Sequence, residues 1–330
     1  MMRVGVTYDL RSDYLALGLG EEETAEFDSE VTIAAICAAL EALGHEPVRI
    51  GNVRRLTEEL AAGARWDAVF NICEGLKGVA REAQVPALLE AYDIPYVFSD
   101  PLTLTLALDK GMAKRVVRAC GVPTPDFAVV TRAEEAKGID LPLPLFLKPV
   151  AEGSGKGVSA KSRVGDRAAL ARVAADLLAR FQQPALAEIF LPGREFTVGI
   201  VGTGEEAEAL GVIEVLWTDK AAEHGYGYEN KEHFEEKMIY RLVDDKAARE
   251  AAEVALGAWR ALRCRDGGRV DIRFGDDGKA YFLEVNPLAG LNPDRSDLVF
   301  IARFKGLSYR DLIGRIMDSF LRRNPQLGGE

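Results

Sequence analysis

The sequence GRVDIRFGDDGKAYFLEVN, at residues 268–286, is typical of two strands joined by a tight turn. Apolar and polar residues alternate on both sides of the central GDDG, as expected of a hairpin that buries one face. Because side chains alternate between the two faces of a strand, Arg269 and Asp271 share one face of the first strand. Glu284 and Asn286 share one face of the second strand for the same reason.

If these two faces coincide, Asp271, Glu284 and Asn286 present three oxygen ligands to one point. Hard oxygen donors that leave room for water are suited to Mg²⁺ that bridges phosphate groups. A solvent-exposed hairpin face is the alternative. Against that alternative, Glu284 lies within the apolar run YFLEV, where an unpaired carboxylate is costly to bury. The pattern therefore favours a magnesium site.

A second polar feature is Lys148, which follows the apolar run LPLFL at the end of an expected strand. An ammonium group there needs an anionic partner, either a protein carboxylate or a ligand phosphate. The glycine-rich sequence EGSGKG, at residues 152–157, comes four residues later, and its free N–H groups can surround a phosphate. Its spacing is not that of a Walker motif, and the first hundred residues contain no G-x-G-x-x-G, which argues against a dinucleotide site.

Two further stretches allow more than one interpretation. Glu188 lies in the apolar run ALAEIFL, and the chain reverses just after it. This pattern suits either a slot for a purine or a hinge between domains. The polar stretch at 218–237 has little apolar periodicity, so we expect a long loop that covers a site. Its Tyr228 and Lys231 are either ligand-binding residues or solvent-exposed ones.

The composition is that of a globular protein with two or three domains: 330 residues, 48% hydrophobic and 28% charged. The formal net charge of −11 disfavours a nucleic-acid or anionic-membrane partner. No apolar stretch approaches the roughly 20 residues that span a bilayer, and no signal peptide is recognisable. Four scattered cysteines and three histidines disfavour a zinc site. We expect a reduced, cytoplasmic setting.

The order of strands and helices predicts an α/β protein. In the first hundred residues short apolar runs alternate with helical patterns, which indicates a parallel sheet. A second α/β unit follows to about residue 193, and strands dominate beyond it, with long helices at 246–262 and 309–322. In the first part the expected strands are 3–8, 47–50, 67–73 and 95–98, and the expected helices are 29–43 and 81–92, the latter bent at Pro86.

Six motifs together resemble the D-alanine–D-alanine ligase group of the ATP-grasp superfamily. They are LDK at 108–110 followed by Lys114, FLKPVAEGS at 146–154, PGREFT at 192–197, YENK at 228–231, GRVD at 268–271 and LEVNP at 283–287. The resemblance implies a Rossmann-like N-terminal substrate domain (the pre-ATP-grasp domain) at 1–107. Two ATP-grasp lobes would follow, at 108–193 and 194–330, with a lid loop at about 218–237.

The resemblance also implies an ATP site with two Mg²⁺ ions, which Mn²⁺ can replace. By role, its members are Lys110, Lys148 and Lys231 for the phosphates, Glu152 in the loop beside them, Glu188 with the backbone of Ile189 and Leu191 for adenine, Glu195 for ribose, and Asp271, Glu284 and Asn286 for the metal.

By the same resemblance, the substrates are two amino acids, which an acyl phosphate intermediate joins into a D-alanyl-D-alanine-type dipeptide with release of ADP and phosphate. The implied substrate residues are Arg269 and the backbone N–H of Gly290 for the oxyanion, Asp28 for the first amino group with Ser154 beside it, Arg295 and Ser296 for the second carboxylate, and Tyr228 of the lid. A homodimer and a place in cell-wall synthesis are also typical of the family.

Three departures affect the amino-acid half of the site. Glu232 follows Lys231 where the family usually has a tyrosine, and a histidine near residues 71–74 is replaced. The stretch from Pro287 to Ser296 is one residue longer than usual. The alternatives are therefore the same chemistry on other amino acids or a small peptide, a nucleotide-binding relative without catalysis, and a nicotinamide dehydrogenase. The retained Arg269 and Lys231 argue against the second, and the missing glycine fingerprint argues against the third.

Overall fold

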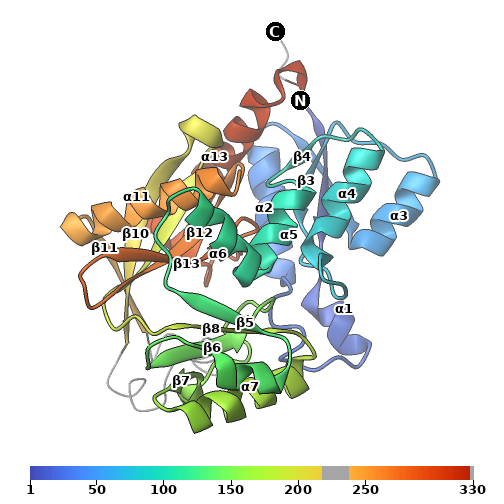
Figure 1. The fold of residues 1–330 in the computed structure, drawn as a ribbon. Coiled ribbons are helices and arrows are strands. Elements are labelled where there is room, and N and C mark those ends of the chain that lie inside the picture. Colours follow the sequence, from blue (N-terminus) through green and yellow to red (C-terminus); the bar gives the residue numbers. More distant parts are fainter. Residues whose placement is uncertain (218–237, 328–330) are drawn as a thin grey trace.

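In the computed structural model, residues 1–217 and 238–327 are described, and their strands form three sheets in separate stretches of the chain (Figure 1). The first sheet has the strand order β2-β1-β3-β4 with every neighbouring pair parallel, which confirms the predicted parallel sheet. Its elements are β1 (Arg3–Tyr8), α1 (Arg11–Ala16), α2 (Glu30–Ala42), β2 (Glu46–Gly51), α3 (Val53–Ala61), β3 (Ala68–Ile72), α4 (Gln84–Ala91), β4 (Tyr96–Val97) and α5 (Pro101–Leu108).

One expected helix of this region is wrong in detail. The helix expected at 81–92 is divided into a 3₁₀ turn at Arg81–Ala83 and the α-helix α4. Pro86 is the third residue of α4, in the first turn, where the N–H groups of a helix have no intrahelical partner to lose. Several elements have no counterpart in the expected pattern. They are α1, α3 and α5 in this region, and β5 (Phe127–Val130), β7 (Arg163–Val164), β8 (Ala185–Ile189), β11 (Met238–Val243) and α12 (Asp297–Phe304) further along the chain.

The second sheet is antiparallel, with the order β5-β8-β6-β7. Helix α7 covers one face of it, and Leu170, Ala174 and Leu177 of that helix pack against Leu145 and Leu147 (Figure 1). Its elements are α6 (Lys110–Ala119), β5 (Phe127–Val130), β6 (Leu145–Pro149), β7 (Arg163–Val164), α7 (Arg167–Phe181) and β8 (Ala185–Ile189).

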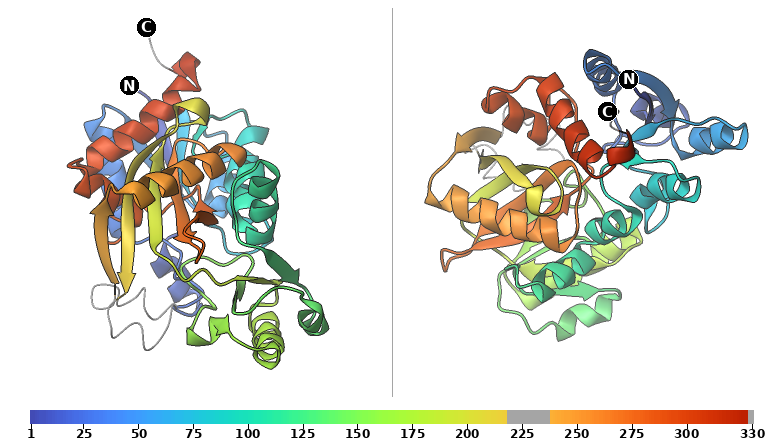
Figure 2. Two further views of the ribbon diagram at one scale, coloured as in Figure 1. Left: turned by 60° about the vertical axis from the view of Figure 1, so that its left-hand side comes forward. Right: turned by 90° about the horizontal axis from the view of Figure 1, so that it is seen from above.

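The third sheet is also antiparallel, with the order β11-β10-β9-β12-β13. Helix α11 packs on one face through Ala251, Ala255 and Trp259, and α12 and α13 lie on the other face (Figure 2). Its elements are β9 (Glu195–Val201), β10 (Glu208–Trp217), β11 (Met238–Val243), α11 (Lys246–Ala261), β12 (Gly267–Phe274), β13 (Ala280–Asn286), α12 (Asp297–Phe304) and α13 (Tyr309–Arg322).

The first and third sheets are joined by a common core and by a buried ion pair. Ile36 and Leu40 of α2 belong to the same apolar cluster as Ile316 of α13. Beside this cluster the fully buried carboxylate of Asp266 pairs with Arg323 at 2.7 Å and accepts a hydrogen bond from the N–H of Phe98 at 2.7 Å. These contacts fix the N-terminal sheet against the C-terminal one, so that their facing loops can form a site.

No helix among residues 1–217 and 238–327 is long and apolar enough to cross a lipid bilayer.

Candidate active site

The hairpin β12–β13 brings its polar side chains together as the alternation predicts. Arg269 lies opposite Asn286, and Asp271 lies opposite Glu284, with an irregularity in register directly after Asp271. Thr197 of the neighbouring strand β9 donates a hydrogen bond to Asp271 at 2.8 Å. The predicted pairing of Asp271 with Glu284 is therefore confirmed, whereas the convergence of these two and Asn286 on one point and their binding of a metal stay predictions.

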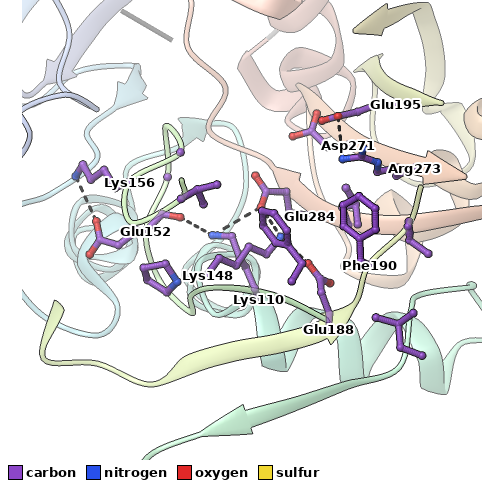
Figure 3. Close-up of a pocket in the computed structure, with 18 residues that line it drawn as sticks. Lys110, Lys148, Glu152, Lys156, Glu188, Phe190, Glu195, Asp271, Arg273 and Glu284 are labelled. Carbon is purple, nitrogen blue, oxygen red and sulfur yellow. Dashed lines mark hydrogen bonds and ion pairs between the residues drawn. The ribbon is translucent and has the colours of Figure 1, made fainter. Parts of the chain in front are cut away.

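Glu284 of this hairpin belongs to a cluster with Glu188 and the buried lysines Lys110, Lys114 and Lys148. Figure 3 shows Lys110, Lys148, Glu188 and Glu284 of this cluster. The Nζ atom of Lys148 is 3.0 Å from Glu188 and 3.4 Å from Glu284. Lys114 pairs with the other oxygen of Glu188 at 2.7 Å, and Lys110 is 3.9 Å from Glu284. Two carboxylates are thus paired with three ammonium groups. These five groups together have an excess of positive charge.

The charge states of this cluster follow from its pairing. Burial alone would raise the pKa of Glu188, but the ammonium groups of Lys114 and Lys148 lower it. Burial lowers the pKa of Lys114 to about 8 although Glu188 opposes the shift. Burial would also lower the pKa of Lys148, but its two carboxylate neighbours raise it above the usual value. Lys148 is therefore a permanent cation that faces a pocket.

We call the pocket that Lys148 faces the lysine pocket. It combines charged groups with apolar walls supplied by Phe146, Ile189, Phe190 and Leu191. At its far end Glu195 pairs with Arg273 at 3.2 Å, and the Arg273 guanidinium lies 5.3 Å from the centre of the Phe190 ring (Figure 3). The lining includes the predicted residues Lys110, Lys148, Glu152, Glu188, Ile189, Leu191, Glu195, Asp271 and Glu284.

A second hollow, the acidic cavity, adjoins the lysine pocket. The two share Lys110, Glu152, Gly153 and Glu284. Its lining includes Glu26, Glu74 and Glu82 from the N-terminal region and, from the rest of the chain, the predicted residues Ser154, Arg269, Asn286 and Gly290.

Arg269 lies between the carboxylates of Asp271 and Asp297. Its guanidinium donates to Asp271 and is 3.5 Å from Asp297. Burial would lower the pKa of Arg269, but these carboxylates raise it, so the guanidinium is held charged and in a fixed orientation. Fixed donors of this kind can stabilise a negative charge that develops beside them.

The glycine-rich loop at 152–157 is anchored by the N-terminal region. The N–H of Gly153 donates to Glu26 at 2.6 Å, and Lys156 of the loop is 3.4 Å from the same carboxylate. Arg81 pairs with Glu26 at 3.0 Å and donates to the carbonyl of Ala151 at 2.9 Å. Burial would raise the pKa of Glu26, but Lys156 and Arg81 lower it. Glu26 therefore joins the two parts of the molecule as a carboxylate.

Other predicted residues lie away from these two hollows. Asp28 is not in the lining of either, and burial raises its pKa to about 7. Arg295 is exposed, and the Ser296 hydroxyl accepts a hydrogen bond from the N–H of Asn292 at 2.8 Å. Tyr228 and Lys231 lie outside the described residues.

Sequence reasoning missed several members of the site: Lys114 as a partner of Glu188, and Glu26, Glu74, Arg81, Glu82 and Lys156 in the acidic cavity and loop anchor. Lys114 follows Lys110 by four residues and so lies on the same helix face, a spacing that could have revealed it. The contact from Glu26 to Gly153 spans 127 residues and leaves no local pattern.

Comparison with known proteins shows which family this chain resembles. A family model described as "D-ala D-ala ligase C-terminus" matches residues 116–318. A D-alanine–D-alanine ligase of Bordetella petrii is 36% identical over 263 residues, which cover 78% of this chain and 77% of the relative.

Two solved structures share the fold at lower identity. The D-alanine–D-alanine ligase from Bacillus anthracis, solved in complex with ATP, has a TM-score of 0.72 at 23% identity and covers 99% of this chain and 100% of its own. The VanG D-Ala:D-Ser ligase from Enterococcus faecalis has a TM-score of 0.72 at 20% identity and covers 96% and 99%.

Proposed function

The chain belongs to the D-alanine–D-alanine ligase family and is an ADP-forming ligase with the ATP-grasp architecture, and we propose that it joins two amino acids, D-alanine among them, into a dipeptide. The observation that carries this proposal is the junction of the two hollows. Lys110, Lys148 and Glu284 supply charges suited to a nucleotide on one side, and Arg269 faces the adjoining cavity on the other.

ATP fits the lysine pocket by the chemistry of its lining. Lys110 and Lys148 are positioned to bind the phosphates, with Lys231 as a further predicted contact. The apolar side chains of Phe146, Phe190 and Leu191 suit adenine between them. Glu195, oriented by Arg273, suits the ribose hydroxyls. Because Glu188 is held by two lysines, its main contribution is to orient Lys148, and its contact with adenine stays a prediction.

A divalent cation is compatible with the same pocket. Asp271, Glu284 and Asn286 would hold it, and their oxygen donors are of the kind that Mg²⁺ or Mn²⁺ prefers. Within the described residues no group of three or more His, Cys, Asp or Glu side chains forms a metal site, so the expected set needs the Asn286 amide and the phosphates of ATP to be complete. When bound, the metal would neutralise phosphate charge during transfer.

The proposed reaction has two steps. The carboxylate of the first amino acid attacks the γ-phosphorus, the bond from that phosphorus to the bridging oxygen breaks, and an acyl phosphate and ADP form. The lysines next to the phosphates offset the charge of the leaving ADP.

The amine of the second amino acid then attacks the carbonyl carbon of the acyl phosphate. The carbonyl oxygen becomes an oxyanion, and Arg269 with the N–H of Gly290 stabilises it. The C–O bond to phosphate breaks, the nitrogen loses a proton, and an amide remains. Water must be excluded until then, because it would hydrolyse the acyl phosphate.

The test is phosphate release from ATP–Mg²⁺ with D-alanine, followed by a panel of other D- and L-amino acids, with the product identified by mass spectrometry. We expect a dipeptide and phosphate with at least one pair. Arg269→Ala should lower kcat at least a hundredfold, about 3 kcal/mol of transition-state stabilisation. Unchanged turnover in Arg269→Ala would refute the assigned role, and ATP binding without any ligation would identify a relative that has lost catalysis.

The setting of this activity is part of the proposal. A dipeptide of D-amino acids serves cell-wall synthesis, whose precursors are assembled in the cytoplasm, and a homodimer is the expected assembly. Light scattering of the purified chain against its 36.0 kDa monomer mass tests the dimer.

A further inference from the structure

The acidic cavity contains more negative charge than the protein around it compensates. Of its three N-terminal carboxylates, Glu26 is compensated by Arg81 at 3.0 Å and Lys156 at 3.4 Å. In the part of the chain that the structure describes, neither Glu74 nor Glu82 has a side-chain hydrogen bond or ion pair. Two carboxylates therefore line the cavity without a direct ion pair, although the charge of Arg81 acts on both and that of Lys110 on Glu82.

The surroundings of these two half-buried carboxylates disfavour their charged forms. Burial raises the pKa of Glu82 to about 7, and burial together with the neighbouring Glu82 raises that of Glu74 well above its usual value. The guanidinium of Arg81 opposes both shifts, but its hydrogen bonds go to Glu26 and the Ala151 carbonyl. Lys110 also opposes the shift of Glu82, without an ion pair to it. A protein retains unpaired carboxylates in a cavity at a cost in stability, which a cationic ligand would offset.

The lining of the acidic cavity also includes a side chain with an unpartnered donor. The Nδ2 atom of Asn286 is buried and has no hydrogen-bond acceptor among residues 1–217 and 238–327. It lies beside Arg269, whose guanidinium lines the cavity, so the lining offers a donor as well as the acceptors of Glu74 and Glu82. An amino acid bound in the cavity would use both, with its carboxylate toward Arg269 and the phosphates and its cationic groups toward the glutamates.

The charge of the cavity favours an organic cation over a metal ion. No set of three or more acidic, His or Cys side chains in the described chain is arranged around one point as metal ligands. Ammonium and guanidinium groups instead accept carboxylates spread along a wall, because their N–H donors point in several directions. A single α-ammonium group neutralises one of the two carboxylates and leaves the other unpaired.

We propose, on the basis of the proposed ligase function, that the amino acid activated by this enzyme carries a second cationic group on its side chain, and that Glu74 and Glu82 bind it. The substrate class is a diamino or guanidino acid, such as ornithine, lysine or arginine. Glu74 follows β3 and Glu82 lies in the 3₁₀ turn at Arg81–Ala83, so both belong to the rigid N-terminal sheet region rather than to the lid.

The test compares binding and turnover of lysine, ornithine, arginine and alanine, in both D and L forms. Binding is measured by calorimetry in the presence of Mg²⁺ and a non-hydrolysable ATP analogue, and turnover by phosphate release. We expect a cationic amino acid to bind ten- to a hundredfold more tightly than alanine, the effect of one charge-assisted hydrogen bond. Glu74→Gln and Glu82→Gln should each reduce this preference at least tenfold.

A matched control and a folding check separate the outcomes. Glu58→Gln removes an exposed carboxylate of the same region, which pairs with Arg55 at 2.9 Å, and should leave the preference unchanged. Because glutamine has the shape of glutamate, thermal unfolding should show both cavity variants folded. Equal or tighter binding of alanine would overturn the proposal while the ligase function stands. Tight binding of the cationic amino acid without any ligation would support the cavity assignment and refute the ligase function.

Discussion

The lysine pocket and the acidic cavity share residues but differ in how far their charges are paired within the protein. In the lysine pocket Lys148 is 3.0 Å from Glu188 and 3.4 Å from Glu284, so its charges are arranged before any ligand binds. In the acidic cavity Glu74 and Glu82 have no such partners among the described residues. The first is preorganised for a nucleotide, whereas the second obtains its counter-charge from the substrate. The pocket for the nucleotide, which the family has in common, thus adjoins the cavity that we propose selects the substrate of this chain.

Among the variants that test this comparison, we expect the largest effect from a substitution of Lys148. Lys148→Met removes the cation between two buried carboxylates and a phosphate contact at once. We expect kcat/KM for ATP to fall at least a hundredfold, or about 3 kcal/mol. Steady-state kinetics measure it, with Lys161→Met, an exposed lysine of the same lobe, as the control. A loss below tenfold in the folded variant would show that the lysine pocket is not arranged around Lys148.

A smaller effect is expected at Glu26, which links the two hollows. Glu26→Gln keeps an acceptor for the N–H of Gly153 but removes the carboxylate paired with Arg81 and one of the two carboxylates paired with Lys156, the other being Glu152 at 3.3 Å. We expect kcat/KM for the amino acid to fall about ten- to thirtyfold, or 1–2 kcal/mol, because the loop that carries Ser154 loses its anchor.

The control for Glu26 is Glu22→Gln. Glu22 also reaches from the N-terminal region to the central lobe, but its pair with Arg180, at 3.9 Å, is solvent-exposed. Exposed pairs contribute little, so its kinetics should match the wild type. Equal losses of kcat/KM in Glu26→Gln and Glu22→Gln would mean that the buried and the exposed ion pairs between these parts of the molecule contribute equally.

The unpaired carboxylates predict a pH dependence of stability without ligand. The pKa of Glu82 is raised to about 7 in the folded state, so between its unfolded value and pH 7 the native state holds more protons than the unfolded state. The free energy of unfolding should therefore fall as the pH rises from 5 to 8, by about 1–2 kcal/mol from this group. Urea unfolding at several pH values measures the slope. A Glu82→Gln variant with the wild-type slope would contradict the assignment.

The smallest effect is expected at the far end of the lysine pocket. Glu195→Gln weakens the pair with Arg273 at 3.2 Å and the proposed ribose contact. We expect KM for ATP to rise about three- to tenfold, the effect of one hydrogen bond of about 1 kcal/mol. Glu208→Gln, which alters an exposed pair with Arg315 in the same lobe, is the control. An unchanged KM would place the ribose elsewhere.

The residues that sequence reasoning identified correctly are those joined by a local period. The alternation of side chains in strands placed Asp271 and Glu284 on matching faces. Because only a tight turn separates the two strands, the contact between these residues could be predicted from the local sequence. The parallel N-terminal sheet followed from the regular succession of strands and helices. Both depend only on residues close together in the chain.

Contacts between distant segments could not be predicted in this way. Glu26 of the N-terminal region reaches Gly153 of the central lobe, and no pattern near residue 26 reveals this contact. The resemblance instead indicated Asp28, two residues away, which lines neither hollow. The excess charge of Glu74 and Glu82 became visible only when the partners of Arg81 were known.

The most direct test of the central claim is the stoichiometry of a complete reaction. Purified chain, ATP–Mg²⁺ and the best amino-acid pair are incubated, and ADP, phosphate and dipeptide are quantified together by chromatography and mass spectrometry. The account predicts one ADP and one phosphate for each dipeptide, with all three lost together in Arg269→Ala. ATP hydrolysis without dipeptide, or dipeptide formation that is indifferent to Arg269, would contradict it.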